Sequence, residues 1–364
     1  SSDDVEKYMK KLEVYYLANK IENLYFTLLG DCTSSNKEIE RFDQGIELAG
    51  KRITEELNSK YGNKFSFIYR RRTWSNDEKC FMGWERKRGL ICQFNEYLKT
   101  GKGDFAVNTF AEIPQVKYII TLDSDTNLTL NSAFQLVGAM SHILNEPEID
   151  RVKNIVVKGH GLIQPRIGLE IEDGRKSVFS RLFAGNGGTD LYTNAISDVY
   201  QDNFEEGIFT GKGIYDLDAF YKVLKNEIPE NTVLSHDLLE GSYLRCGLAS
   251  DIVLMDGYPS KYSAYKARMH RWIRGDVQII GWLKSKLNTL SKYKIIDNLM
   301  RNKNEEYILI SILALALAKP KFLFIPLIIY SLPTLILLVD NIINQKRGTF
   351  KSKFYVINHT TSPA

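Results

Sequence analysis

Helical and strand-like patterns of apolar residues alternate along the first part of the chain. Apolar residues at helical spacing predict helices over residues 5–17, 37–61, 89–98 and 133–144. Short, mostly apolar runs predict strands over residues 24–29, 65–69, 117–122 and 155–163, the last with a Gly-His-Gly break. This alternation is typical of an α/β domain. An open nucleotide-binding sheet begins with a strand, whereas this chain begins with a helix. We therefore expect the first strand to be missing or replaced by an element from elsewhere.

Two apolar runs stand near the C-terminus. They cover residues 307–318 and 322–339, with Lys319-Pro320-Lys321 between them. The first run is short for a membrane span, and the second is marginal and contains Pro326 and Pro333. Two tilted transmembrane spans, a re-entrant hairpin and a buried helical pair all fit this pattern.

The stretch before these runs is basic and amphipathic. Apolar residues recur there at helical spacing, at Leu287, Leu290, Tyr293, Ile296 and Leu299. This spacing predicts a helix that lies in a membrane interface. Basic residues flank the apolar runs on both sides: Lys284, Lys286, Lys292, Lys294, Arg301 and Lys303 before them, and Lys346, Arg347, Lys351 and Lys353 after them. They favour a lipid bilayer as a partner, with the main domain on the cytoplasmic side of the inner membrane.

These patterns divide the chain into four segments. The α/β domain covers residues 1–283, and the interfacial helix covers residues 284–305. Transmembrane or re-entrant segments cover residues 306–343, and a polar tail covers residues 344–364.

Composition adds two restrictions. The formal net charge is only +4, from 48 Lys and Arg against 44 Asp and Glu, and no long basic run dominates. This balance argues against nucleic acid as a partner. The four cysteines lack metal or redox spacing, and no signal peptide is visible, so we expect reduced thiols on the cytoplasmic side.

The strand predicted at residues 117–122 delivers two carboxylates to its end. Asp123 and Asp125 follow the apolar run with one residue between them. Two hard oxygen ligands at one point, with phosphate nearby, would bind Mg²⁺ or Mn²⁺. The alternative is an ordinary Asp-Ser-Asp turn before the next helix.

Two further candidates precede this pair. Asp31 follows a predicted strand, where a carboxylate can accept hydrogen bonds from a base or ribose, although a turn residue is the commoner explanation. Lys87 and Gly89, in the run Lys-Arg-Gly, offer a cation and a close backbone to a diphosphate. A solvated charge run would look the same.

Three candidates follow the acidic pair. The Gly-rich loop Thr210, Gly211, Lys212 and Gly213 permits close approach of a ligand but lacks the spacing of a phosphate-gripping loop. Asp237 begins a predicted helix, as a helix cap or as a general base for a hydroxyl. Arg268, Arg271 and Trp272 share a predicted helix, and their guanidinium and indole groups suit a pyrophosphate and a sugar.

Taken together, these motifs resemble those of processive inverting GT-A glycosyltransferases such as the cellulose, chitin and hyaluronan synthases. Longer stretches resemble the glycosyltransferase domain of cyclic β-1,2-glucan synthases, glycosyltransferase family 84. They are Trp-Glu-Arg-Lys-Arg-Gly at 84–89, Ser-Asp-Val-Tyr-Gln-Asp at 197–202, Phe-Thr-Gly-Lys-Gly-Ile-Tyr-Asp at 209–216, Ser-His-Asp-Leu-Leu-Glu-Gly at 235–241 and His-Arg-Trp-Ile-Arg-Gly-Asp at 270–276. The resemblance runs from about residue 5 to residue 300 and implies a Rossmann-like mixed sheet flanked by helices.

The resemblance implies transfer of glucose from UDP-glucose, with inversion, to a growing β-1,2-glucan. It assigns Asp123 and Asp125 to the metal, with Asp123 also serving the nucleotide sugar. Asp31, Lys87, Gly89, Arg268 and Arg271 would also contact the nucleotide sugar. Asp237 would be the base, and residues 210–213 with Trp272 would contact the glucan acceptor.

Family members are several times longer, with further transmembrane segments and a phosphorylase-like domain. The resemblance therefore implies that this chain is part of a larger synthase polypeptide. Two other functions stay open. One is a non-catalytic glucan- or nucleotide-binding module of such a synthase, and the other is a nucleotidyltransferase, which also places acids on a metal at a sheet edge.

Overall fold

The computed structural model describes residues 1–183 and 198–344, which form a mixed α/β structure. The predicted α/β class is confirmed. By its internal contacts the chain divides into two compact units, Ser1–Ile167 with Ala195–Met255, and Gly168–Asn194 with Asp256–Ala364.

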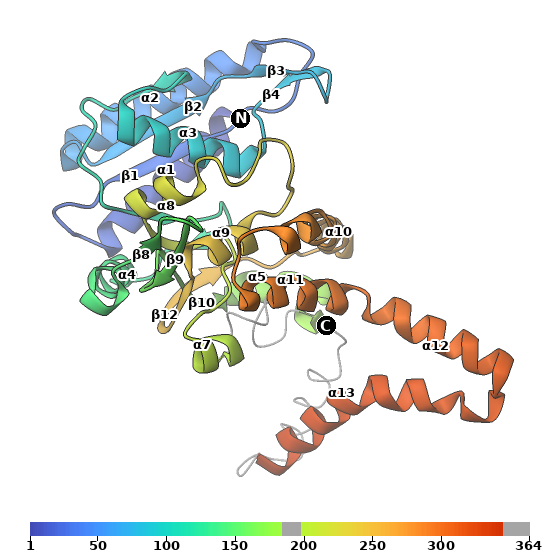
Figure 1. The fold of residues 1–364 in the computed structure, drawn as a ribbon. Helices are drawn as coiled ribbons and strands as arrows, with labels where there is room; N and C mark the ends of the chain where they lie inside the picture. Colours follow the sequence, from blue (N-terminus) through green and yellow to red (C-terminus); the bar gives the residue numbers. More distant parts are fainter. Residues whose placement is uncertain (184–197, 345–364) are drawn as a thin grey trace. The chain divides into compact units, whose positions relative to one another are not determined.

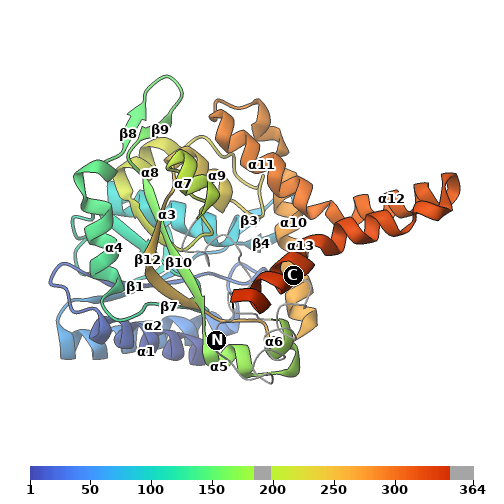
Figure 2. The ribbon, with the colours of Figure 1, turned by 90° about the horizontal axis from the view of Figure 1, so that it is seen from below.

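A three-stranded sheet begins the first unit. Its order is β1 (Phe26–Gly30), β2 (Phe65–Arg70), β5 (Phe105–Asn108), with β1 parallel and β5 antiparallel to β2. Every residue of β2 is buried, because helices cover both of its faces. Helices α1 (Ser2–Ala18) and α2 (Arg41–Tyr61) lie side by side over one face (Figures 1 and 2). Phe67 packs there against Gly50, and Ile68 packs on the opposite face against Phe94 of α3 (Arg86–Thr100).

A five-stranded sheet follows, in the order β6 (Tyr118–Thr121), β11 (Gly213–Asp216), β10 (Leu162–Leu169), β12 (Gly247–Asp256), β7 (Thr126–Asn127). Strand β11 is antiparallel to both β6 and β10. Helix α4 (Ser132–Ser141) covers one face through Leu136 and Met140, which pack against Ile163 and Ile214. Helix α8 (Leu217–Leu224) also packs against β11, where the Phe220 ring lies 4.3 Å from that of Tyr215.

Shorter elements complete this unit. They are the hairpins β3 (Thr73–Ser75) with β4 (Cys80–Met82) and β8 (Glu148–Asp150) with β9 (Ile155–Lys158), the 3-10 turn η1 (Ile143–Asn145), and helices α7 (Val199–Phe204) and α9 (Asp237–Leu244). The strand predicted over 155–163 is wrong as one element, because the chain turns at Gly159 (φ +61°) and splits it into β9 and β10.

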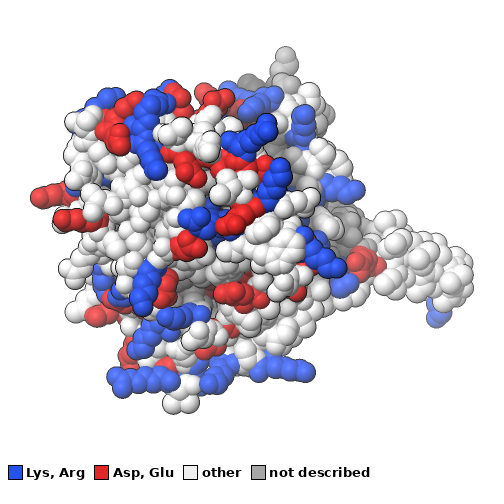
Figure 3. Space-filling view, turned by 90° about the horizontal axis from the view of Figure 1, so that it is seen from above, with Lys and Arg blue, Asp and Glu red and all other residues white. Residues whose placement is uncertain are grey.

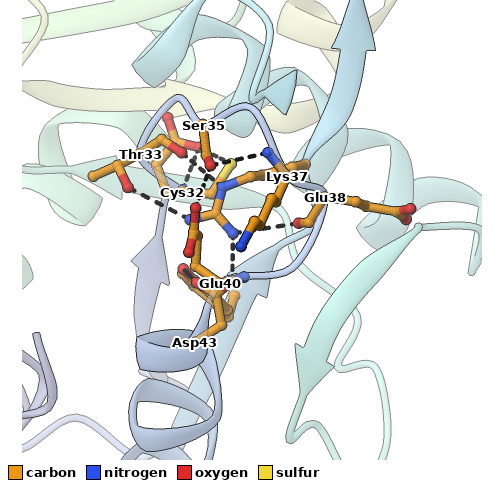
Figure 4. Close-up of polar contacts among 10 residues, drawn as sticks. Cys32, Thr33, Ser35, Lys37, Glu38, Glu40 and Asp43 are labelled. Atoms are coloured by element: carbon orange, nitrogen blue, oxygen red, sulfur yellow. Dashed lines mark hydrogen bonds and ion pairs between the residues drawn. The ribbon is translucent and has the colours of Figure 1, made fainter. Parts of the chain in front are cut away.

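A buried arginine holds the loop after β1. Arg72 Nε donates to the Thr33 carbonyl oxygen at 2.7 Å, and its Nη1 pairs with Asp43 at the start of α2 (Figure 4). The side chains of Arg72 and Asp43 are only 2% and 5% exposed. Tyr69 Oη and the Glu40 backbone N–H also donate to Asp43, both at 2.7 Å. The loop that follows Asp31 is thereby fixed to β2 and α2.

The second unit is helical in its described part. It contains α5 (Ile171–Arg175), α6 (Val178–Phe183), α10 (Tyr262–Gln278), η2 (Ile279–Lys284), α11 (Thr289–Asn302), α12 (Asn304–Ala318), η3 (Pro320–Phe322) and α13 (Phe324–Asn344). The helix predicted over 284–305 is present as α11. Its outer side exposes Tyr293, Ile296 and Met300, whereas Lys294 is 2% exposed and adds nothing to a basic surface.

The apolar runs form α12 and α13, which are separated at Pro320 as the sequence pattern predicts. Among helices of the described residues, none has both the length and the apolar character that crossing a membrane requires. The transmembrane segments expected over 306–343 are therefore not confirmed. The basic residues Lys346 to Lys353, most of the polar tail and Ser197 lie outside the described residues.

Basic and acidic side chains are interspersed over the face drawn in Figure 3. This arrangement agrees with the small net charge of the chain.

Candidate functional site

Asp123 lies at the end of β6, where two lysine side chains, Lys87 and Lys212, approach its carboxylate. Its carbonyl oxygen accepts a hydrogen bond from Thr126 N at 3.1 Å, which turns the chain sharply after the strand. Lys87 Nζ pairs with Asp123 Oδ1 and donates to the Gly211 carbonyl oxygen at 2.8 Å. Lys212 Nζ lies 3.7 Å from Asp123 Oδ2. The cluster thus joins α3, the end of β6 and the Gly-rich loop.

The two lysines set the charge of Asp123. Burial pushes the pKa of this carboxyl group upward, but Lys87 and Lys212 outweigh burial and hold the pKa below its usual range. Asp123 is therefore an anion at neutral pH. Its partners are cations that a diphosphate would also attract.

A strained turn at the start of α3 places Lys87. Glu85 and Arg86 adopt φ of 44° and 45°, values that non-glycine residues rarely take. Arg70 holds this turn, because its guanidinium donates to the carbonyl oxygens of Trp84 at 2.7 Å and Arg86 at 3.1 Å. The Arg70 side chain is 1% exposed at the end of β2. The position of Lys87 therefore depends on Arg70, a side chain buried at the end of β2.

Arg70 also meets Asp31, with 3.5 Å between Nη1 and Oδ1. Burial raises the pKa of Asp31, although Arg70 opposes this effect. The same site is crowded by backbone. A Cβ on Gly83 would lie 2.5 Å from Asp31 Oδ1, and one on Gly89 would lie 2.1 Å from the Trp84 carbonyl oxygen. Glycine at both positions is what lets the segment from Gly83 to Gly89 close over Arg70 and Asp31.

The Gly-rich loop packs directly on Asp237. Gly211 has φ +85°, and a Cβ there would lie 2.7 Å from Asp237 Oδ1. Gly213 starts β11, where a Cβ would lie 2.3 Å from the Ile163 carbonyl oxygen. Thr210 N and Oγ1 donate to Oε1 of the buried Gln164 at 2.9 and 3.1 Å. The loop is thus fixed on both sides, and its glycines allow the close approach to Asp237.

Asp237 stands at the N-terminus of α9 beside two other titratable groups. His236 Nδ1 lies 2.9 Å from Glu240 Oε1 and 3.5 Å from Asp237 Oδ1. Asp237 Oδ1 is buried and has no hydrogen-bond donor within the described residues. The Asp237 side chain as a whole is nevertheless 29% exposed. A carboxylate so arranged can accept a proton from a bound hydroxyl.

No family model matches this chain. It is 40% identical over 309 residues, 82% of its length, to the cyclic β-(1,2)-glucan synthase NdvB of Rhizobium meliloti. The chain is homologous to one region of this synthase. The match covers 11% of the synthase, so the chain spans only a small part of its relative.

Two places in this synthase-like chain offer metal ligands. Asp123 and Asp125 lie in the turn between β6 and β7, as the sequence pattern predicts. That their carboxylates share one metal ion remains a prediction. His236, Asp237 and Glu240 form the second place, with one ligand atom from each within 4.8 Å of the others.

The predicted site residues are divided between the two units of the chain. Arg268, Arg271 and Trp272 are on α10 in the second unit, with Arg271 exposed and the other two half-buried. Their participation in the site around Asp123 remains a prediction. Asp31, Lys87, Gly89, Thr210, Gly211, Lys212, Gly213 and Asp237 all belong to the first unit.

Four residues of this site were not predicted from the sequence: His236, Glu240, Arg70 and Gln164. His236 is the N-cap residue of α9, and Glu240 follows it four residues later, a spacing that signals contact. Arg70 and Gln164 are buried polar residues in mostly apolar strands. A buried polar side chain in a strand requires a hydrogen-bond or ion-pair partner. A polar residue within an apolar stretch was therefore the sequence signal that could have identified both residues.

Proposed function

We propose that the chain is a glycosyltransferase unit that transfers glucose from UDP-glucose, with inversion, to a growing β-1,2-glucan. The observation that carries this proposal is the convergence of Lys87, Lys212 and Asp123 with Gly211 and Asp237 in a chain 40% identical to a β-(1,2)-glucan synthase. UDP-glucose as the donor is inferred from the resemblance to cyclic β-1,2-glucan synthases, and the β-1,2 linkage from that resemblance and from the name of the relative.

The donor would bind along the segment from Asp31 to Lys87. Asp31 would accept hydrogen bonds from the uridine, and the close backbone at Gly89 would line the nucleotide. Lys87 and Lys212 would exchange part of their contact with Asp123 for the diphosphate oxygens. Asp123 and Asp125 offer the hard oxygens that suit Mg²⁺ or Mn²⁺. A metal ion held there would neutralise charge on the leaving diphosphate.

Transfer would be a single displacement at the anomeric carbon. The acceptor hydroxyl oxygen forms the new bond to this carbon, while the bond to the diphosphate oxygen breaks and its electron pair leaves with UDP. Asp237 takes the hydroxyl proton, a contribution of roughly 10² to 10⁴ in rate. Gly211 and its neighbours, with Trp272 of the second unit, would contact the acceptor sugar. Arg268 and Arg271 would serve the diphosphate.

We further place this unit at the inner membrane, facing the cytoplasm, as part of a larger synthase. The apolar side chains of α12 support contact with lipid, since Leu309, Leu313 and Leu317 are 58%, 55% and 90% exposed. Tyr293, Ile296 and Met300 of α11 would lie in the interface.

The direct test is incubation of the chain with UDP-glucose, Mg²⁺ or Mn²⁺ and a short β-glucan primer, followed by linkage analysis. Release of UDP with new β-1,2 linkages supports the proposal. Release of pyrophosphate would favour a nucleotidyltransferase. Binding of UDP and Mn²⁺ without transfer would favour a nucleotide-binding module, and the absence of binding a glucan-binding or assembly module.

A further inference from the structure

The segment of residues 225–236 joins α8 to α9 and ends directly before Asp237. It contains neither helix nor strand, so its position depends on the contacts that it makes with other elements. Ile228 and Val233 anchor it by their side chains, which are buried, whereas the residues between them are exposed. The backbone of the segment is held from the start of α3.

Glu85 and Arg88, at the start of α3, form a buried ion pair. Arg88 Nη1 lies 2.7 Å from Glu85 Oε2, and the side chains of Arg88 and Glu85 are 6% and 4% exposed. A buried pair of this kind contributes little net stability, because two apolar side chains of similar volume often do as well. Its role therefore depends on what else the two groups bind.

Both groups bind the backbone of segment 225–236. Thr232 N donates to Glu85 Oε1 at 3.0 Å, and the Val233 backbone N–H donates to the same carboxylate. Arg88 Nη2 donates to the Ile228 carbonyl oxygen at 2.6 Å. The segment is thus fixed at two points, and the second of them lies only four residues before Asp237.

The same turn also places Lys87. Glu85 and Arg86 adopt positive φ, and strained backbone of this kind persists only where surrounding contacts hold it, often at functional sites. Lys87, between the members of the buried pair, contacts Asp123 and the Gly211 carbonyl oxygen. One short turn therefore fixes both the cation assigned to the diphosphate and the segment that leads into the base.

We propose that Glu85 and Arg88 are positioning residues, which hold segment 225–236 to the turn of Lys87 and so set Asp237 relative to the bound donor. This inference rests on the proposed function. Both side chains are more than nine-tenths buried, so they act through the segment and not on a substrate. A displacement of about 1 Å at the reacting groups can lower a rate about 10²-fold, which makes such a hold matter for transfer.

The kinetic test replaces both charges at once. A chain with Glu85→Met and Arg88→Met should stay folded, because apolar side chains of similar volume replace the pair, but it loses the contacts to Thr232, Val233 and Ile228. Its kcat for glucose transfer should fall about 10- to 100-fold, while KM for UDP-glucose changes little, since Arg70 still holds the turn.

Two further variants serve as comparisons. Arg88→Lys keeps a cation beside Glu85 and should lose less activity than the double variant. Lys99→Met removes another ion pair of α3, with Asp218 of α8, and should leave kcat unchanged. Melting temperatures measured in parallel identify variants that fail to fold. A folded double variant with near-normal kcat overturns the inference.

Asp237→Asn separates positioning of the base from a general structural role. If the buried pair acts through Asp237, then adding Glu85→Met and Arg88→Met to Asp237→Asn should cost little beyond the loss from Asp237→Asn alone. A further loss as large as the one seen in the unaltered chain overturns the inference.

Hydrogen exchange provides a measurement that needs no turnover. The backbone amides of residues 228–236 should exchange several-fold faster in the double variant, because Thr232 and Val233 lose their acceptor, and Lys99→Met should not change them. Unchanged exchange in the double variant overturns the inference. If the chain transfers no glucose but exchange rises as expected, the hold on the segment stands and the proposed function fails.

Discussion

Lys87 Nζ forms an ion pair with Asp123 Oδ1 and at the same time donates to the Gly211 carbonyl oxygen at 2.8 Å. The start of α3 is thereby tied to the end of β6 and to the loop that packs on Asp237. One ammonium group thus links the part of the chain assigned to the nucleotide with the part assigned to the acceptor.

Replacing Lys87 should weaken nucleotide binding. We expect Lys87→Met to lower the affinity for UDP about 10- to 100-fold, since a charge-assisted contact contributes roughly 1.5–3 kcal/mol. Isothermal titration in the presence of Mn²⁺ measures this. Lys99→Met is the matched control, because Lys99 lies on the same helix and pairs with Asp218. Equal affinities for the two variants would contradict the role of Lys87.

Crowding at Asp31 gives a second prediction. An alanine at Gly83 would place its Cβ 2.5 Å from Asp31 Oδ1 and 2.7 Å from Arg70 Nη1, so one of these groups must move. We expect Gly83→Ala to lower UDP affinity about tenfold or more. Gly138→Ala in α4 is the control, because a Cβ there meets nothing within 4 Å. It should stabilise the chain by about 0.5–1 kcal/mol without changing UDP affinity.

The buried pair of Asp43 and Arg72 gives a pH-dependent prediction. Burial pushes the pKa of Asp43 upward, but hydrogen bonds from Arg72, the Glu40 backbone and Tyr69 outweigh burial and lower it. The stability that the carboxylate contributes is therefore present above the usual carboxyl range and is lost as the pH falls through the lowered pKa. Asp43→Asn should cost about 3–5 kcal/mol in the free energy of unfolding at pH 7.

Urea unfolding at neutral and acidic pH measures this difference, which should shrink as the pH falls. Asp104→Asn is the control, because Asp104 is 73% exposed and pairs with the neighbouring Arg71. Its cost should stay below about 1 kcal/mol. A difference for Asp43→Asn that does not depend on pH would contradict the assignment.

Much of the first unit could be predicted from periodicity. Helices α2 and α3 and strand β2 were found within a few residues, because long amphipathic helices and fully buried strands leave strong patterns. The order of strands in the two sheets could not be predicted, since β11 joins β6 and β10 from a distant part of the chain. Short hairpins such as β3 with β4 leave too few apolar positions to be seen.

The residues of the candidate site were named from the sequence, but the contacts among them were not. Asp123, Lys87, Gly211 and Asp237 were all identified, but no pattern indicated that Lys87 reaches Asp123 or that Gly211 packs on Asp237. Those contacts depend on how α3 and β11 meet the end of β6. His236 and Glu240 were within a recognised motif, yet their meaning depends on burial, which a single sequence does not reveal.

Lipid contact by α12 and α13 can be tested by flotation. The chain should float with vesicles that contain anionic lipid, and a variant without residues 304–344 should float less. Leu309→Asp and Leu313→Asp should act in the same direction, because both side chains are more than half exposed. Equal flotation of the intact and shortened chains would contradict lipid contact by this segment.

We propose Asp237 as the base of a UDP-glucose-dependent transferase. The most direct measurement compares Asp237→Asn with the unaltered chain for both UDP affinity and the rate of glucose transfer. The variant should bind UDP within about twofold of the unaltered chain, because Asp237 is assigned to the acceptor, and should lose roughly 10²- to 10⁴-fold in transfer. Near-normal transfer by Asp237→Asn would contradict the claim.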